Sequence, residues 1–192
     1  MPDSFVMILY IFSCVDLKMK MANVSIRTVY FIVLSMLLAC SPEQENIYTN
    51  NFISYPLIAG SEYDFEGVAN VRELRKGGVE LKLILSGEKT TEPYFYPAHL
   101  HFGPYDSPDA PMAQMLSPVD ARTLESKTVI NQLHDGSSMD FIRFSTLDGH
   151  IKVHLAEDGP DYNTILVVGN VGVNADMSIN LEKMTMCSPY SY

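Results

Sequence analysis

The feature that most constrains this chain is an alternation of apolar and polar residues over short segments that turn-forming residues separate. Residues 76–78 (KGG) are followed by 79–86 (VELKLILS), in which every second residue is apolar. A period of two places successive side chains on opposite faces of a strand, and the glycines suit a tight turn. Residues 63–86 therefore predict a β-hairpin with one buried face.

Further short segments of the same kind predict an all-β protein. We predict additional strands at 94–102, 128–133, 141–144, 150–155, 164–173 and 177–184, with Asp-Gly turns at 135–136, 148–149 and 158–159. No segment has a convincing helical repeat over ten or more residues. The pattern favours an antiparallel Greek-key β-sandwich or barrel. Residues 103–117, rich in Pro and Asp, are expected to form a surface loop, and loops this long commonly serve a function.

The first forty residues have the composition of an export signal. Lys20 and Arg27 precede an apolar run at 29–38 (VYFIVLSMLL), and the small Ala39 precedes Cys40. A basic start, a short apolar run and a small residue are typical of a secretory signal, and the run is short for a permanent membrane span. Residues 37–40 (LLAC) resemble a lipobox, which implies cleavage before Cys40 and a lipid on its thiol. The alternative is an ordinary membrane anchor that happens to contain a cysteine.

These features divide the chain into four expected parts. They are a signal peptide at 1–39 (with 1–18 a start-site artefact if translation begins at Met19 or Met21), a flexible lipidated tether at 40–58, a β domain at 59–186 and a tail at 187–192. The acidic residues Glu43 and Glu45 resemble export tags of surface lipoproteins, so we expect an outer-membrane protein of the cell envelope. Cys187, then the only free thiol, is not expected to be catalytic.

The net charge of the whole chain is −10, which repels the phosphates of nucleic acids and makes them improbable partners. The chain also lacks a Gly-rich phosphate loop, a Cys-x-x-Cys pair and a Gly-x-Ser-x-Gly motif. Nothing in it therefore predicts an enzyme. The expected partners are a membrane, through the lipid, and a protein or surface polymer.

Four of the five histidines lie in two predicted strands. The period of two places His99 and His101 on one face of the first strand, and His150 and His154 on the polar face of the second. We therefore expect these side chains to point outward, and to converge if the two strands are neighbours. Side chains of a His-x-His pair are roughly 6 to 7 Å apart, close enough to share one metal ion.

The metal interpretation has a plain alternative, because a His-x-His pair on a half-exposed strand is usually a pair of partly solvated side chains. Met112 and Met115 could supply soft ligands for copper, but apolar packing under the loop explains them as well. His134, beside Asp135-Gly136, is expected to be a turn residue.

Four blocks of sequence resemble the chordin-type (CHRD) domain of lipoproteins in the Bacteroidetes group. They are 96–103 (YPAHLHFG), 116–120 (LSPVD), 148–155 (DGHIKVHL) and 168–172 (VGNVG). That domain is similar to the copper/zinc superoxide dismutase sandwich, whose pattern has a His-x-His pair followed by Gly and a later Val-His. The resemblance implies His99, His101 and His154 as copper ligands.

The sequence departs from the dismutase pattern in two respects. The chain has no histidine between His101 and His134, so the histidines of the zinc loop and the metal bridge have no counterpart, and the arginine that guides superoxide has no clear match. Dismutase activity is therefore not expected. Two hypotheses are left: a non-enzymatic, lipid-anchored envelope protein, and a copper-binding protein that uses His99, His101 and His154.

Overall fold

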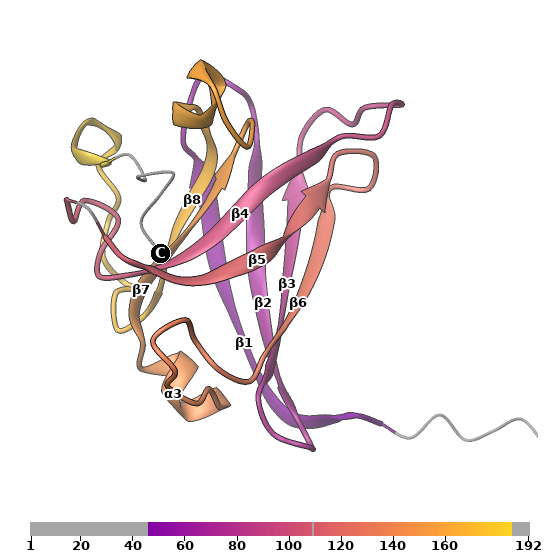
Figure 1. The fold of residues 1–192 in the computed structure, drawn as a ribbon, viewed down its shortest axis with the longest axis vertical. Helices are drawn as coiled ribbons and strands as arrows, with labels where there is room; N and C mark the ends of the chain where they lie inside the picture. Colours follow the sequence, from indigo (N-terminus) through magenta and orange to yellow (C-terminus); the bar gives the residue numbers. More distant parts are fainter. Residues whose placement is uncertain (1–45, 109, 186–192) are drawn as a thin grey trace, which may run out of the picture. The chain divides into compact units, whose positions relative to one another are not determined.

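The computed structural model describes residues 46–108 and 110–185, and the chain from Asn46 onward forms a compact unit of its own. Its strands close into an antiparallel barrel (Figure 1). They are β1 (Tyr48–Ala59), β2 (Glu66–Leu74), β3 (Val79–Ser86), β4 (Phe95–Phe102), β5 (Met112–Asp120), β6 (Glu125–Ile130), β7 (Asp148–His154) and β8 (Ile165–Gly172). Three short helices lie between or after them: α3 (Phe141–Ser145), η1 (Pro160–Asn163) and η2 (Leu181–Lys183).

The order of strands around the barrel is β1-β2-β3-β6-β5-β4-β7-β8, and β1 pairs with β8 to close it. β4, β5 and β6 are consecutive neighbours, and β7 returns by a long connection to lie beside β4. This arrangement is a Greek key. The prediction of an all-β antiparallel Greek-key fold is confirmed, and the long connection is what makes β4 and β7 neighbours.

The predicted hairpin is present as β2 and β3. Glu73 pairs with Val79 across the turn, where Gly77 and Gly78 have φ angles of 94° and 77°. The apolar residues of β3 at positions 79, 81, 83 and 85 are all buried, as the alternation requires.

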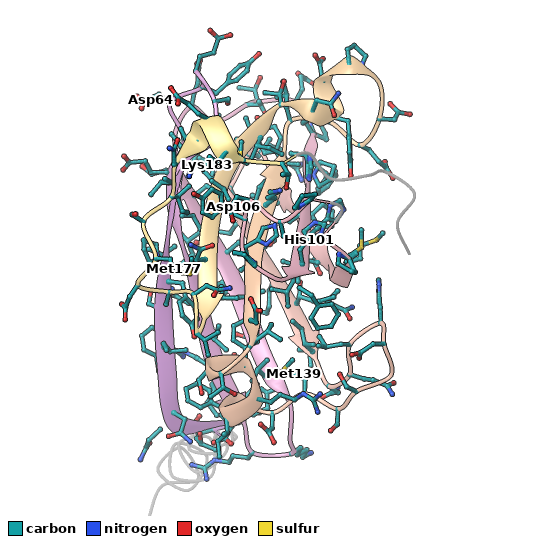
Figure 2. All side chains as sticks on the ribbon, turned by 90° about the vertical axis from the view of Figure 1, so that its left-hand side faces the viewer. Asp64, His101, Asp106, Met139, Met177 and Lys183 are labelled. Carbon is teal, nitrogen blue, oxygen red and sulfur yellow. The ribbon has the colours of Figure 1, made fainter. Side chains whose placement is uncertain are left out.

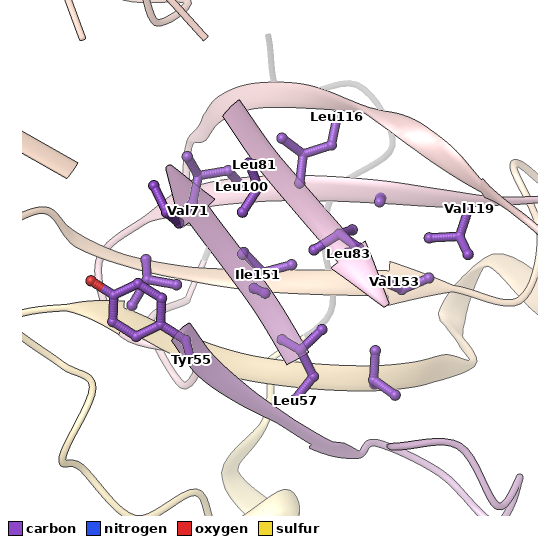
Figure 3. Packing of buried hydrophobic residues seen from close by; sticks show 14 of the residues in the cluster. Tyr55, Leu57, Val71, Leu81, Leu83, Leu100, Leu116, Val119, Ile151 and Val153 are labelled. Atoms are coloured by element: carbon purple, nitrogen blue, oxygen red, sulfur yellow. The ribbon is translucent and has the colours of Figure 1, made fainter. Parts of the chain in front are cut away.

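The barrel interior holds the main hydrophobic core. Figure 3 shows Leu83 of β3, Leu100 of β4 and Ile151 of β7 among the side chains that meet there. Each fully buried Leu or Ile side chain contributes roughly 1.5–3 kcal/mol through removal from water. The positions of β4 and β7 are thus fixed from inside, by alternate residues of each strand.

The flexible tether predicted for 40–58 is wrong over its described part, because residues 48–58 belong to β1. Tyr55 and Leu57 of that strand are buried and point into the core, and Ile53 packs against it. Pro56 and the residues Asn50 and Asn51 are unfavourable in strands, and they hide this alternation in the sequence.

The predicted loop at 103–117 is also too long, since β5 begins at Met112. The core residues of β5, Ala113, Leu116 and Val119, are three positions apart rather than two. The pairing of β4 with β5 also shifts register twice. Irregular pairing of this kind breaks the period on which strand prediction depends. β6 likewise begins at Glu125, before the predicted 128.

Two predicted strands are not strands. Residues 141–144 lie in α3, where the Asp140 side chain accepts a hydrogen bond from the Arg143 amide at 2.7 Å and caps the helix. Residues 177–184 contain only the short helix η2. In the part of the chain that the structure describes, no helix is long and apolar enough to cross a membrane. The predicted signal peptide, the predicted lipidation site Cys40, and Cys187 lie outside the described residues.

Candidate functional site

The four strand histidines lie on the outer face of the barrel, where β4 and β7 are paired. His101 is opposite His150, and His99 is opposite Lys152. The residues that alternate with this set along β4 and β7 point into the core; they are Ala98, Leu100, Ile151 and Val153. The predicted face is therefore confirmed, and the two strands are neighbours, which was the condition for the histidines to converge.

The expected exposure of these histidines is wrong. His99 is 7 % exposed and the other three are 1 % or less. Segments that follow β4, β7 and β8 cover this face of the barrel. Figure 2 views that side and labels His101 together with Asp106, Met177 and Lys183 of the covering segments.

Specific contacts join these covering segments to the face that carries the histidines. The Tyr162 ring of η1 stacks on His154, with ring centres 4.5 Å apart and planes 12° apart. Lys152 donates a hydrogen bond to the carbonyl of Thr185, and the Thr185 hydroxyl donates to the carbonyl of Ser107 at 2.7 Å. The C-terminal segment and the loop after β4 are thus joined to each other and to the site.

The imidazole rings form a continuous row. Ring centres are 5.1 Å apart for His154 and His99, 5.8 Å for His99 and His101, and 5.1 Å for His101 and His150. His134 is exposed in a turn, as predicted. The structure therefore brings together the three predicted ligands, His99, His101 and His154, and adds His150 to them.

In three of the four rings, a hydrogen bond defines which nitrogen carries a lone pair. The Nδ1 atoms of His101, His150 and His154 contact the carbonyls of Ala110, Gly103 and Tyr162 at 3.1, 2.8 and 2.7 Å. A carbonyl only accepts, so each Nδ1 carries the proton and Nε2 carries the lone pair. The Nε2 atoms of His150 and His154 and the Nδ1 atom of His99 are buried without a hydrogen-bond partner.

The environment keeps these rings neutral. Burial lowers the pKa of His99 to about 3, and the neighbouring His154 and His101 lower it further. Burial also lowers the pKa of His150 to about 3 and that of His154 to about 4. The hydrogen bonds to the carbonyls of Gly103 and Tyr162 act in the opposite direction and raise these pKa values, but burial has the larger effect. The pKa of His101 is lowered by the same cause. The charge of Lys152 lowers the pKa of His101, His150 and His154 further. At neutral pH these rings are therefore uncharged.

The ring separations can be compared with those of a shared metal. Two imidazoles bonded at ~2 Å place their ring centres about 3.2 Å from the metal, and a tetrahedral angle then separates the centres by about 5 Å. The separations of His99 from His154 and from His101 lie close to this value, and these rings are inclined by 53° and 79°. The rings of His101 and His150 are nearly parallel, at 12°. A metal bonded to an imidazole nitrogen lies in the plane of that ring. One metal therefore cannot bind both His101 and His150 in these orientations unless the two rings are coplanar.

The donor atoms are not yet arranged as in a loaded site. Across residues 46–108 and 110–185, no group of three or more His, Cys, Asp or Glu side chains is placed to hold a metal ion. A metal shared by His99, His101 and His154 would therefore require the rings to rotate from their present positions.

A pocket of about 480 Å³ opens beside the cluster and is bounded by one of its histidines, His99. Tyr162, Met112 and Met115 line it, and Glu157 and Asp158 lie at its edge.

Sequence reasoning missed two members of this site. Lys152 lies between His150 and His154 on the same face, so the period of two already placed it there, yet a buried lysine is rare enough that exposure was the natural expectation. Tyr162 lies in the short helix η1, and no local signal in the sequence connects it to His154. Comparison with protein-family models, with curated proteins and with solved structures gave no match for this chain.

Proposed function

We propose that this protein binds a copper ion through Nδ1 of His99 and Nε2 of His101 and His154. The observation that carries the proposal is the set of buried ring nitrogens at the cluster. Two of these three nitrogens are buried without a partner, and the hydrogen bond from Nδ1 of His101 leaves its lone pair on Nε2.

A purely structural role explains these nitrogens less well. A buried polar atom without a partner costs about 1–3 kcal/mol, so proteins rarely retain several in one place. A bound metal would remove that cost at His99 and His154. The carbonyls of Ala110 and Tyr162 would hold His101 and His154 in the required tautomer, which is the usual arrangement behind metal-binding histidines.

Copper is the metal we favour because imidazole suits copper and zinc, and the resemblance to the dismutase sandwich points to copper at these three positions. We propose binding or buffering rather than catalysis, since the sequence has no counterpart of the dismutase zinc loop. With the lipobox at 37–40, the protein would hold copper at the cell envelope, anchored through lipid on Cys40.

The test is a copper titration of the unit from Asn46 to Tyr192, with zinc in parallel. Wild type should bind one equivalent of copper more tightly than zinc. The His99→Gln/His101→Gln double variant should lose more affinity than the 10–100-fold that follows when only a residue hydrogen-bonded to a metal ligand is changed. His134→Gln, which changes an exposed histidine, should bind like wild type. Circular dichroism confirms that each variant is folded. Equal, weak copper uptake by wild type and the double variant would contradict the proposal.

A further inference from the structure

The pocket beside His99 contains two methionines that the imidazole site does not use. In the pairing of β4 with β5, Met115 is opposite His99 and Met112 is opposite His101. Directly opposed residues in an antiparallel pair have Cβ atoms about 4.5–5.5 Å apart and share one face. Both thioethers therefore belong to the same outer face as the two histidines, and both line the pocket.

The two methionines differ in burial, and Met115 is not a core residue. Met115 is 47 % exposed, although it neighbours a nearly buried histidine, whereas Met112 is 8 % exposed and therefore buried; neither belongs to the main cluster of buried hydrophobic residues. Ala113, Leu116 and Val119 are the residues by which β5 packs into the barrel. The alternative weighed from the sequence, apolar packing under the loop, thus leaves Met115 unexplained.

The charges at the pocket favour cations. The exposed carboxylates of Glu157 and Asp158 at its edge raise the local concentration of cations.

We propose that Met112 and Met115 form an entry site for Cu(I), through which the ion reaches the imidazole cluster at His99. Thioethers are soft ligands that select Cu(I) over harder cations, and Ag(I) is its redox-inert equivalent. This inference rests on the proposed function in one respect, namely that the imidazole cluster is the site to which the ion is delivered. No electron transfer is involved, because the ion enters and binds as Cu(I).

The experiment uses the unit from Asn46 to Tyr192 with ¹³C-methyl methionine and Ag(I) as the probe. The methyl resonances of Met112 and Met115 should shift on titration. Met177 is the matched control, because it is 49 % exposed but lies in the C-terminal segment, outside the residues that line this pocket. The Met112→Leu/Met115→Leu variant, which keeps apolar volume, should bind Ag(I) at least tenfold more weakly and load Cu(I) at least tenfold more slowly. Its Cu(II) affinity should be unchanged.

The two proposals fail in different ways. If Ag(I) shifts neither Met112 nor Met115, or shifts Met177 equally, the entry site is wrong even where Cu(II) still binds at the histidines. If the two methyl groups shift but the His99→Gln/His101→Gln variant binds Cu(II) as well as wild type does, the thioether site is supported and the imidazole site is contradicted.

Discussion

Acidification should destabilise the metal-free protein in a pH range where most proteins are still stable. The unfolded chain binds a proton at each histidine as the pH falls below 6.5, whereas folded His99 and His150, with pKa values of about 3, and His154, at about 4, do not. Because the folded-state pKa values lie below the unfolded value, the contribution of these histidines to the free energy of unfolding is fully present above pH 6.5. It is lost as the pH falls from 6.5 towards the folded-state pKa values.

The magnitude follows from the slope of about 1.4 kcal/mol per pH unit for each proton. At pH 5, which is about 1.5 units below the unfolded pKa, each of these three histidines costs about 2 kcal/mol. If they act independently, the free energy of unfolding should fall by about 6 kcal/mol, which is comparable to the whole stability of many domains. Carboxylates contribute mainly below pH 5, so the interval from pH 7 to 5 isolates the histidines.

The assay is urea unfolding in EDTA at pH 7 and pH 5, followed by far-UV circular dichroism and by tyrosine fluorescence, since the chain has no tryptophan. The His150→Gln variant should lose about 2 kcal/mol less than wild type over this interval. His134→Gln should follow the wild-type profile, because His134 is exposed. A wild-type loss below about 1 kcal/mol would refute the reasoning, because it would mean that these rings are not held neutral by burial.

Three further predictions test the barrel and the anchor. Gly172→Ala should lower the free energy of unfolding by at least about 2 kcal/mol, because φ is 60° and a Cβ would meet the carbonyl oxygen of Leu147. Gly77→Ala, where a Cβ would meet open space, should cost about 1 kcal/mol. Equal costs for the two variants would contradict this reasoning. Phe144→Ala should cost about 3–5 kcal/mol, since its ring is fully buried against Tyr55, and a loss below about 1 would show that α3 does not close this end of the core. Cys40→Ser should abolish incorporation of labelled palmitate in bacterial cells; persistent labelling would place the lipid elsewhere.

The parts of the fold that the sequence predicts are those set by local alternation. The hairpin of β2 and β3 and the polar face shared by the histidines both follow from a period of two. β1 and β5 escape prediction because Pro56 interrupts one pattern and register shifts break the other.

The burial of the histidines could not be predicted locally. It depends on segments distant in the sequence: Tyr162 of η1 stacks on His154, and Thr185 of the C-terminal segment accepts a hydrogen bond from Lys152 on the same face. A strand pattern tells which face a side chain occupies, but not what later covers that face. For the same reason, the lowered pKa values and the hydrogen bonds that define the tautomers became visible only in the fold.

The most direct test of the central claim is a crystal structure of the copper-soaked protein with anomalous data at the copper edge. We expect one peak about 2 Å from Nδ1 of His99 and from Nε2 of His101 and His154, with the rings rotated towards it. His150 should lie outside the coordination sphere, because its ring is nearly parallel to that of His101. No peak at the cluster, or copper only at exposed groups such as His134, would contradict the account.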